Sequence, residues 1–170
     1  MELLLVRHAI AYERDARRWR DDGLRPLSAR GITRARKAAQ GLKQLAPRPA
    51  RVLSSPLLRA RQTANILAES AGWPNPITCA QLLPGAPPEE LLAVLARSGA
   101  PCMAVVGHEP GLSELLAACV AAGAPGAFQF RKMGVAQVSF RGAARAGRGH
   151  LVWFLPPRVL RAACHARPRG

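Results

Sequence analysis

The stretch LLLVRH at residues 3–8 is an apolar run that stops at an arginine and a histidine. The same pattern returns as RVLSSP at residues 51–56 and as MAVVGH at residues 103–108. Near-continuous apolar runs of this length are typical of parallel strands that are buried on both faces. We therefore expect three central strands of one sheet, each followed by polar residues.

Helical spacing of apolar residues separates these strands. Between residues 28 and 45, apolar side chains recur every three or four positions, and lysines and arginines occupy the other face. A second helix is expected over residues 56–72, with proline at its first position and Ser55 as its N-cap. Further helices are expected after residue 88 and from about residue 110.

This alternation predicts a single-domain α/β protein, a three-layer α/β/α sandwich with a mainly parallel central sheet. Two more strands are expected at residues 135–140 and 151–155. We place the domain at residues 1–156. Residues 157–170 carry arginines and no acidic residue, and we expect them to form a basic, partly disordered C-terminal tail.

The polar residues that follow the predicted strands define a candidate site. In parallel sheets, ligands bind beyond the carboxyl ends of the strands, where neighbouring loops converge. His8, Ser55 and His108 all lie at such ends. Although they are far apart in the sequence, we expect them to share one site.

Three segments together carry a family resemblance: LVRH at residues 5–8, SSPLLRARQT at residues 54–63 and VGH at residues 106–108. In this order, each at a predicted strand end, they resemble the histidine phosphatase superfamily, which has the phosphoglycerate mutase-like fold. The small size and the RPLS segment at residues 25–28, with Gly31, are most similar to SixA-type phosphohistidine phosphatases.

The resemblance implies an enzyme with a covalent phosphohistidine intermediate. It implies that His8 is the nucleophile, that Arg7 and Arg59 bind the phosphoryl group, and that His108 stabilises the phosphate during transfer. Arg25 has two open interpretations. It either contacts phosphate or pairs with an acidic residue such as Asp21 or Asp22.

The same residues suit phosphoryl transfer on chemical grounds. The transition state spreads negative charge over three oxygens, so the protein mainly supplies position and positive hydrogen-bond donors. Arginine binds phosphate oxygens through two N–H groups and stays charged. A histidine nucleophile must be neutral, and neighbouring guanidinium groups lower its pKa.

The general acid is harder to assign. The segment QLLPG at residues 81–85, where superfamily members place a carboxylate, has none. Glu89 and Glu90 follow shortly but suit the first turn of a helix, and Glu109 is a further candidate. The absence of a strong general acid matters less when the leaving group is an imidazole, because an imidazole departs more easily than an alkoxide.

This absence favours phosphohistidine as the substrate. The stretch between Arg59 and His108 is too short for a large lid, and an open site admits a phosphorylated side chain of another protein. The expected partner is therefore a phosphorylated protein, for example a histidine-containing phosphotransfer domain. The first alternative is a phosphomonoesterase with the same mechanism that acts on a sugar phosphate, a nucleotide or a similar small phosphoester.

The composition of the chain bears on two further functions and on where the protein is found. The net charge of +15 is compatible with a basic nucleic-acid-binding domain, but the chain lacks stacking aromatics and a glycine-lysine phosphate loop, so no specific nucleic acid is expected. A non-catalytic phosphopeptide binder is a weaker alternative, since every motif residue is present. No apolar segment is long enough for a membrane anchor, and we expect a cytoplasmic protein.

The cysteines and histidines argue against two other chemistries. None of the four cysteines is followed by an arginine six positions later, which excludes a cysteine-dependent phosphatase, and their scatter indicates free thiols. The histidines lack a carboxylate cluster, so we expect neither a metal nor another cofactor.

Overall fold

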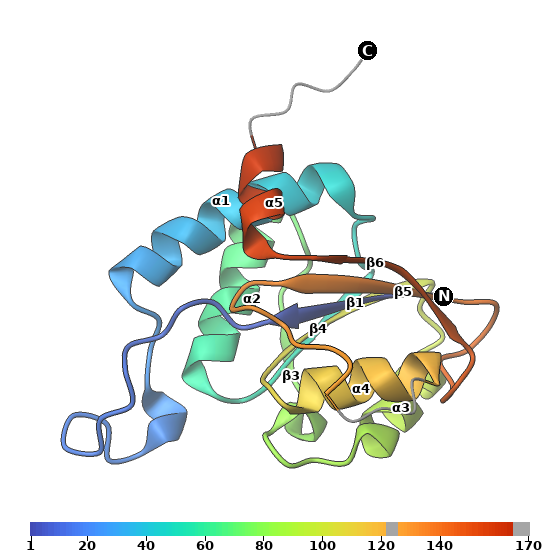
Figure 1. Cartoon of the computed structure of the whole chain (residues 1–170), viewed down its shortest axis with the longest axis horizontal. Helices are drawn as coiled ribbons and strands as arrows, with labels where there is room; N and C mark the ends of the chain where they lie inside the picture. The colour runs from blue at the N-terminus through green and yellow to red at the C-terminus, as the bar shows by residue number, and fades with distance from the viewer. Residues whose placement is uncertain (122–125, 165–170) are drawn as a thin grey trace.

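The structure is a computed structural model that describes residues 1–121 and 126–164 (Figure 1). Its strands are β1 (Glu2–Arg7), β2 (Arg51–Ser54), β3 (Ile77–Thr78), β4 (Cys102–Gly107), β5 (Val135–Phe140) and β6 (Gly149–Leu155). Its α-helices are α1 (Ala29–Leu45), α2 (Leu58–Ala71), α3 (Pro88–Arg97), α4 (Gly111–Val120) and α5 (Pro157–Ala163). Two short 3-10 helices are η1 (Asp22–Leu24) and η2 (Ala80–Leu82).

The described strands form one sheet in the order β3-β2-β4-β1-β5-β6. Strands β3, β2, β4 and β1 run parallel to one another, whereas β5 is antiparallel to both of its neighbours, β1 and β6. Strand β1 lies between β4 and β5, with Leu5 opposite Val105. The predicted mainly parallel sheet is confirmed, and its antiparallel edge is the hairpin of β5 and β6.

Alternate residues of the central strand divide the core into two layers. Leu4 and Val6 pack in a buried cluster with residues of α1, α2 and α5. Leu3 and Leu5 point to the other face and pack with residues of α3 and α4. Figure 1 shows these two groups of helices on opposite sides of the sheet, so the predicted three-layer α/β/α architecture is confirmed.

Helix α5 belongs to this core. Leu160 is fully buried in the cluster that contains α1, and a Cβ atom added to Gly41 would lie 1.7 Å from the Leu160 carbonyl oxygen. The two helix backbones therefore touch. Residues 157–163, which the sequence analysis assigns to a tail, are helical because this apolar contact outweighs the charge of the arginines around it. Residues 165–170 lie outside the described residues.

Among the residues that the structure describes, no helix has the length and apolar character needed to cross a membrane.

Candidate active site

The tips of the parallel strands bring the predicted site residues together. Beyond β1, the His8 N–H donates to the Gly107 carbonyl at 3.0 Å, and beyond β2 the Ser55 N–H donates to the Val106 carbonyl at 2.9 Å. These bonds extend the sheet ladder and hold the residues after each strand in line. As a result, the rings of His8 and His108 lie with their centroids 5.0 Å apart.

The ring of His8 is held in one orientation. Only 7% of the residue is exposed, and Nδ1 lies 2.7 Å from the carbonyl oxygen of Ala9. A carbonyl only accepts, so Nδ1 carries the proton and the lone pair is on Nε2. Burial, together with the charges of His108, Arg59 and Arg7, lowers the pKa of His8 to about 3. The imidazole is therefore neutral at neutral pH.

The ring of His108 is held through Nε2, whereas the ring of His8 is held through Nδ1. Its Nε2 lies 2.9 Å from the hydroxyl of Ser55, whose oxygen also faces the N–H of Leu57 at 3.4 Å. The hydroxyl can accept from Leu57 and donate to Nε2, which leaves the proton of a neutral ring on Nδ1. Burial, followed by the charges of Arg59, Arg7 and Arg25, lowers the pKa of His108 to about 4.

This contact corrects the expected role of Ser55. Helix α2 begins at Leu58, with Leu57 as its N-cap residue and no side-chain cap bond. Ser55 is engaged with His108 across the site instead, because β2 and β4 are neighbouring strands whose ends meet. The predicted helix start is thus two residues early, and Arg59 is the second residue of α2.

Arg59 enters the cluster from the start of α2 and is 6% exposed. Its Nη1 donates to the backbone oxygen of Asp22 at 2.9 Å and lies 3.3 Å from the Asp22 carboxylate. One helical turn later, the Thr63 hydroxyl donates to the Arg59 carbonyl at 2.7 Å and accepts from the Ala9 N–H at 3.0 Å. Thr63 thereby joins α2 to the loop that follows His8.

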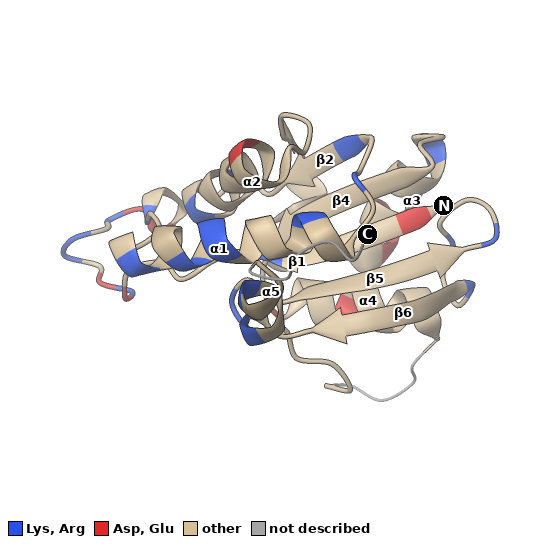
Figure 2. Cartoon of the chain, turned by 90° about the horizontal axis from the view of Figure 1, so that it is seen from above, with Lys and Arg blue, Asp and Glu red and all other residues tan. Residues whose placement is uncertain are grey.

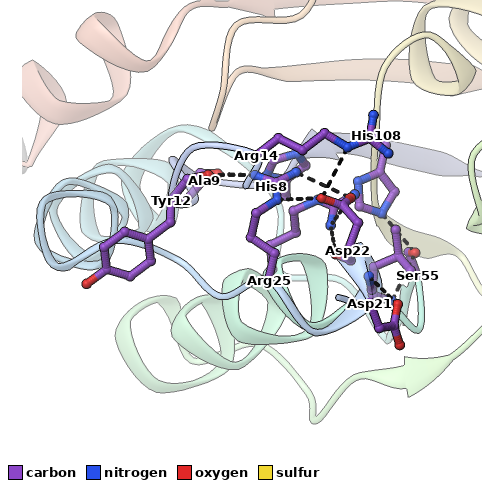
Figure 3. A network of polar contacts seen from close by, with 12 residues as sticks. His8, Ala9, Tyr12, Arg14, Asp21, Asp22, Arg25, Ser55 and His108 are labelled. Carbon is purple, nitrogen blue, oxygen red and sulfur yellow. Dashed lines mark hydrogen bonds and ion pairs between the residues drawn. The ribbon is translucent and has the colours of Figure 1, made fainter. Parts of the chain in front are cut away.

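The structure pairs Arg25 with Asp22, not with Asp21. Arg25 Nε lies 2.7 Å from the Asp22 carboxylate, and its Nη1 donates to the Tyr12 carbonyl at 2.7 Å. Asp21 instead caps η1 by accepting from the Gly23 N–H. In Figure 3, dashed lines join the Asp22 carboxylate to the arginine side chains around it, among them Arg14 and Arg25.

Asp22 was considered from the sequence only as a partner of Arg25. It also contacts Arg59, and Arg14 Nε lies 3.6 Å from its carboxylate. The hydrogen bond from Arg25, with the charges of Arg25, Arg59 and Arg14, lowers the pKa of Asp22. The only feature of the sequence that pointed to Asp22 was its position three residues before Arg25. No local pattern indicates that a residue of η1 contacts a residue of α2.

Arg7, the last residue of β1, is linked to Glu109. The Arg7 guanidinium donates through Nη1 to the Phe130 carbonyl, and the Phe130 N–H donates to the Glu109 carboxylate at 2.6 Å. The second carboxylate oxygen of Glu109 accepts from the Ser113 hydroxyl at 2.6 Å. Both oxygens of this candidate general acid are therefore engaged, one with the chain segment that contacts Arg7 and the other with α4.

The other acid candidates lie apart from these contacts. Glu89 and Glu90 are exposed in the first turn of α3, the position where acidic side chains favour the helix dipole. The hydrogen bonds and ion pairs of the described residues connect neither of them to the two histidines or the arginines. Within the described ranges, no three His, Cys, Asp or Glu side chains gather in a group that could hold a metal ion.

Several buried polar atoms of the cluster have no protein partner. Among the described residues, four buried side-chain nitrogen or oxygen atoms lack a hydrogen bond, and three of them are Arg7 Nε, Arg59 Nε and His108 Nδ1. Buried polar groups in native proteins are nearly always paired, so each of these atoms needs a partner such as water or a bound ligand. Two of these three atoms belong to guanidinium groups, which favours an anion.

A buried neutral histidine beside a second histidine and arginines, at the carboxyl edge of a parallel sheet, defines an enzyme of phosphoryl transfer. The model of the "Histidine phosphatase superfamily (branch 1)" matches residues 3–83 of the chain. An uncharacterized protein of Picosynechococcus sp. is 44% identical over 117 residues, which cover 67% of this chain and 70% of that protein. The chain belongs to the histidine phosphatase superfamily.

Similarity extends over nearly the whole chain in other relatives. The phosphohistidine phosphatase SixA of Escherichia coli is 28% identical over 170 residues, covering 96% of this chain and 98% of SixA. A solved structure of the protein histidine phosphatase SixA in complex with tungstate aligns with a TM-score of 0.81 and 27% identity, covering 94% of this chain and 99% of that one. The expected family and the phosphoglycerate mutase-like fold are confirmed.

Proposed function

We propose that this protein is a phosphatase that removes the phosphoryl group from phosphohistidine on another protein, through a covalent intermediate on His8. The observation that carries this proposal is the 2.7 Å contact between His8 Nδ1 and the Ala9 carbonyl. It leaves the lone pair of Nε2 free in a ring whose pKa is lowered to about 3. His8 is therefore a nucleophile in its reactive form at neutral pH.

In the first step, Nε2 of His8 forms a bond to phosphorus while the bond between phosphorus and the substrate nitrogen breaks. The departing imidazole takes a proton from solvent. In the second step, a water oxygen attacks the phosphorus, the bond to His8 breaks, and inorganic phosphate leaves. Across both steps one water is consumed, its protons are shared between the products and solvent, and His8 is regenerated as a neutral ring.

The surrounding arginines, together with the neutral ring of His108, stabilise the charge on the transferring group. Arg7 and Arg59 each have a buried Nε without a protein partner, and His108 has an unpaired Nδ1. These donors suit the three equatorial oxygens of the transition state. Asp22 positions Arg25 and Arg59, and its lowered pKa keeps it ionised at neutral pH, which suits a positioning residue better than a general acid.

The choice of phosphohistidine rests on the leaving group and on the relatives. The relative named phosphohistidine phosphatase matches this chain almost end to end, and its structural counterpart binds tungstate, a tetrahedral oxyanion. Of the carboxylates considered as general acids, Glu109 is engaged elsewhere and Glu89 is exposed. A substrate whose leaving group needs little help from an acid therefore fits best. We place the reaction in the cytoplasm, where the four free cysteines would stay reduced.

Trapping the intermediate tests this proposal. The enzyme is mixed with a ³²P-labelled phosphohistidine peptide and quenched in alkali, and the labelled residue is located by mass spectrometry. We expect an acid-labile, alkali-stable phosphate on His8, which is lost in His8→Asn and retained in Cys102→Ala. A label on another residue, or a label that persists in His8→Asn, contradicts the mechanism.

A substrate panel separates the proposed substrate from the phosphomonoester alternative. The kcat/KM for the phosphohistidine peptide is compared with those for sugar phosphates and nucleotides. We expect the peptide to be preferred. If the monoesters are turned over faster by orders of magnitude, the covalent mechanism stands but the phosphohistidine assignment does not.

A further inference from the structure

A cavity lies beside the residues His8, His108, Arg7 and Arg59, which are called the catalytic cluster below. Of the residues that line this cavity, only Arg7 has a role in the mechanism proposed above. It has a volume of about 470 Å³ and is enclosed by the end of β1, the first half of α1, the start of α5 and the loop before β5. Its charged lining residues are Arg7, Arg34, Arg131, Lys132 and Arg161. This group is called the basic cavity below.

The positive charge of the basic cavity is not neutralised by acidic residues in its lining. Five of its lining residues are cationic, and the lining contains no aspartate or glutamate. Figure 2 shows lysines and arginines along α1 and on α5, the two helices that form one side of it. Converging cations without a neutralising carboxylate raise the local concentration of anions. An anionic ligand would supply the missing counter-charge.

The rim of the basic cavity is held firmly in place. The Met133 N–H donates to the carbonyls of Arg7 at 3.1 Å and His8 at 3.2 Å, and the Gly134 N–H donates to the Arg131 carbonyl at 2.6 Å. Met133 adopts a φ of +66°, which an ordinary side chain rarely takes and which this tight turn requires. The turn, which lies in the loop before β5, therefore holds the exposed residues Arg131 and Lys132 beside the end of β1.

Arg7 connects the basic cavity to the catalytic cluster. The lining of the cavity includes Arg7 and Ala9, the residues directly before and after the proposed nucleophile His8. A ligand in the basic cavity thus lies next to a phosphoryl group bound at His8. The volume exceeds what one phosphate needs, and the cations come from four separate segments, an arrangement that suits several anionic groups along a chain.

We propose that the basic cavity binds acidic side chains that flank the phosphohistidine of the partner protein. This inference rests on the proposed function and specifies the substrate as a phosphohistidine in an acidic segment. The acidic neighbours would add charge-assisted hydrogen bonds beside the scissile bond and would steer the encounter. A second basic cavity, lined by Arg141, Arg145, Arg148 and His150, shares no residue with the catalytic cluster and serves as the control.

Two synthetic peptides test the proposal. Both carry one histidine and a fluorophore, and the histidine is flanked by four glutamates in one peptide and by four glutamines in the other. Their dissociation constants are measured by fluorescence anisotropy without phosphorylation, and kcat/KM is measured after phosphorylation. The wild type is compared with the double variant Arg131→Glu/Lys132→Glu and the control Arg145→Glu/Arg148→Glu, which changes net charge equally.

We expect the wild type to prefer the glutamate peptide about tenfold or more in both measurements, as paired charges at an interface allow. The preference should disappear in Arg131→Glu/Lys132→Glu and persist in the control. Equal affinity of the wild type for both peptides, or an equal loss in the control, overturns the proposal. Because anisotropy requires no chemistry, a missing label on His8 refutes the catalytic proposal alone, and a labelled enzyme without peptide preference refutes this inference alone.

Discussion

His8 is uncharged at neutral pH because burial and nearby cations disfavour its protonated form, and the same causes act on His108. This has a consequence for stability. In the unfolded chain both imidazoles take up a proton near their ordinary pKa of about 6.5. The folded protein binds fewer protons than the unfolded chain between that pH and about 4, so acid favours unfolding.

The first prediction follows from this difference. As the pH falls from 7 to 5, the free energy of unfolding should decrease by up to roughly 1.4 kcal/mol per pH unit for each of the two buried histidines. His8→Asn removes one contribution and should flatten the curve, whereas His150→Asn, at an exposed position, should leave it unchanged. Urea unfolding at several pH values measures this, and parallel curves for wild type and His8→Asn would contradict the buried neutral state.

A second prediction at the residue level concerns Glu109. Its carboxylate accepts a hydrogen bond from the Phe130 N–H, and the Phe130 carbonyl accepts one from the Arg7 guanidinium. Glu109→Ala should raise KM about tenfold by loosening Arg7, a cost in the range of a lost buried hydrogen bond. Glu109→Gln keeps an acceptor for the Phe130 N–H and should largely restore activity. Steady-state kinetics with p-nitrophenyl phosphate and with phosphoserine measure the effect.

The two substrates separate positioning from acid catalysis. A positioning residue affects a good and a poor leaving group by the same factor, whereas loss of a general acid affects mainly the poor one. Glu114→Ala, at an exposed position in the first turn of α4, which follows Glu109, is the control and should be neutral. A selective loss with phosphoserine would restore Glu109 as the acid.

The sequence predicted which residues gather at the site better than how they are held. His8 and His108 could be placed because each follows an apolar run, and strand ends meet at one edge of a parallel sheet. The roles of Asp22 and Glu109 could not be predicted. Both depend on contacts between segments that are distant in the sequence: η1 contacts α2, and the loop before β5 contacts the segment between β4 and α4. No local spacing encodes such contacts.

At the level of elements, α1 and α5 are in contact through Gly41. A methyl group at this position would collide with the Leu160 carbonyl, which is backbone and cannot rotate away. Gly41→Ala should therefore lower the free energy of unfolding by about 2 kcal/mol or more, as overpacking does in a dense core. Gly111→Ala has no neighbour within 4 Å and should be neutral or slightly stabilising. Chemical denaturation measures both, and an equally stable Gly41→Ala would show that α5 is loosely attached.

Long periodic helices and the buried strands were predictable because burial imposes a regular pattern on the sequence. Strand β3 was missed because it comprises only Ile77–Thr78, both exposed at the sheet edge, and it therefore has no apolar pattern. Helix α5 was missed because it has a single buried leucine among arginines, and one buried apolar residue does not make a helical pattern. These elements are short, and their stability comes from the partner against which they pack rather than from local propensity.

At the scale of the whole molecule, the proposed mechanism assigns to arginine side chains the positive charge that a metal ion provides in other phosphatases. We therefore expect turnover of the phosphohistidine peptide to be unchanged after dialysis against EDTA. Added Mg²⁺ should give no activation. A marked loss on chelation that Mg²⁺ or Zn²⁺ restores would show that an ion takes part.

The Thr63 hydroxyl, bonded at once to the loop after His8 and to the helix that carries Arg59, ties two parts of the catalytic cluster together. Neither part can drift without breaking a buried hydrogen bond. The site is therefore preorganised before the substrate binds. The conformational entropy of ordering these side chains is lost once, during folding, and not each time a substrate binds. For the proposed reaction, we therefore expect turnover to be limited by binding and release of the phosphorylated partner rather than by assembly of the site.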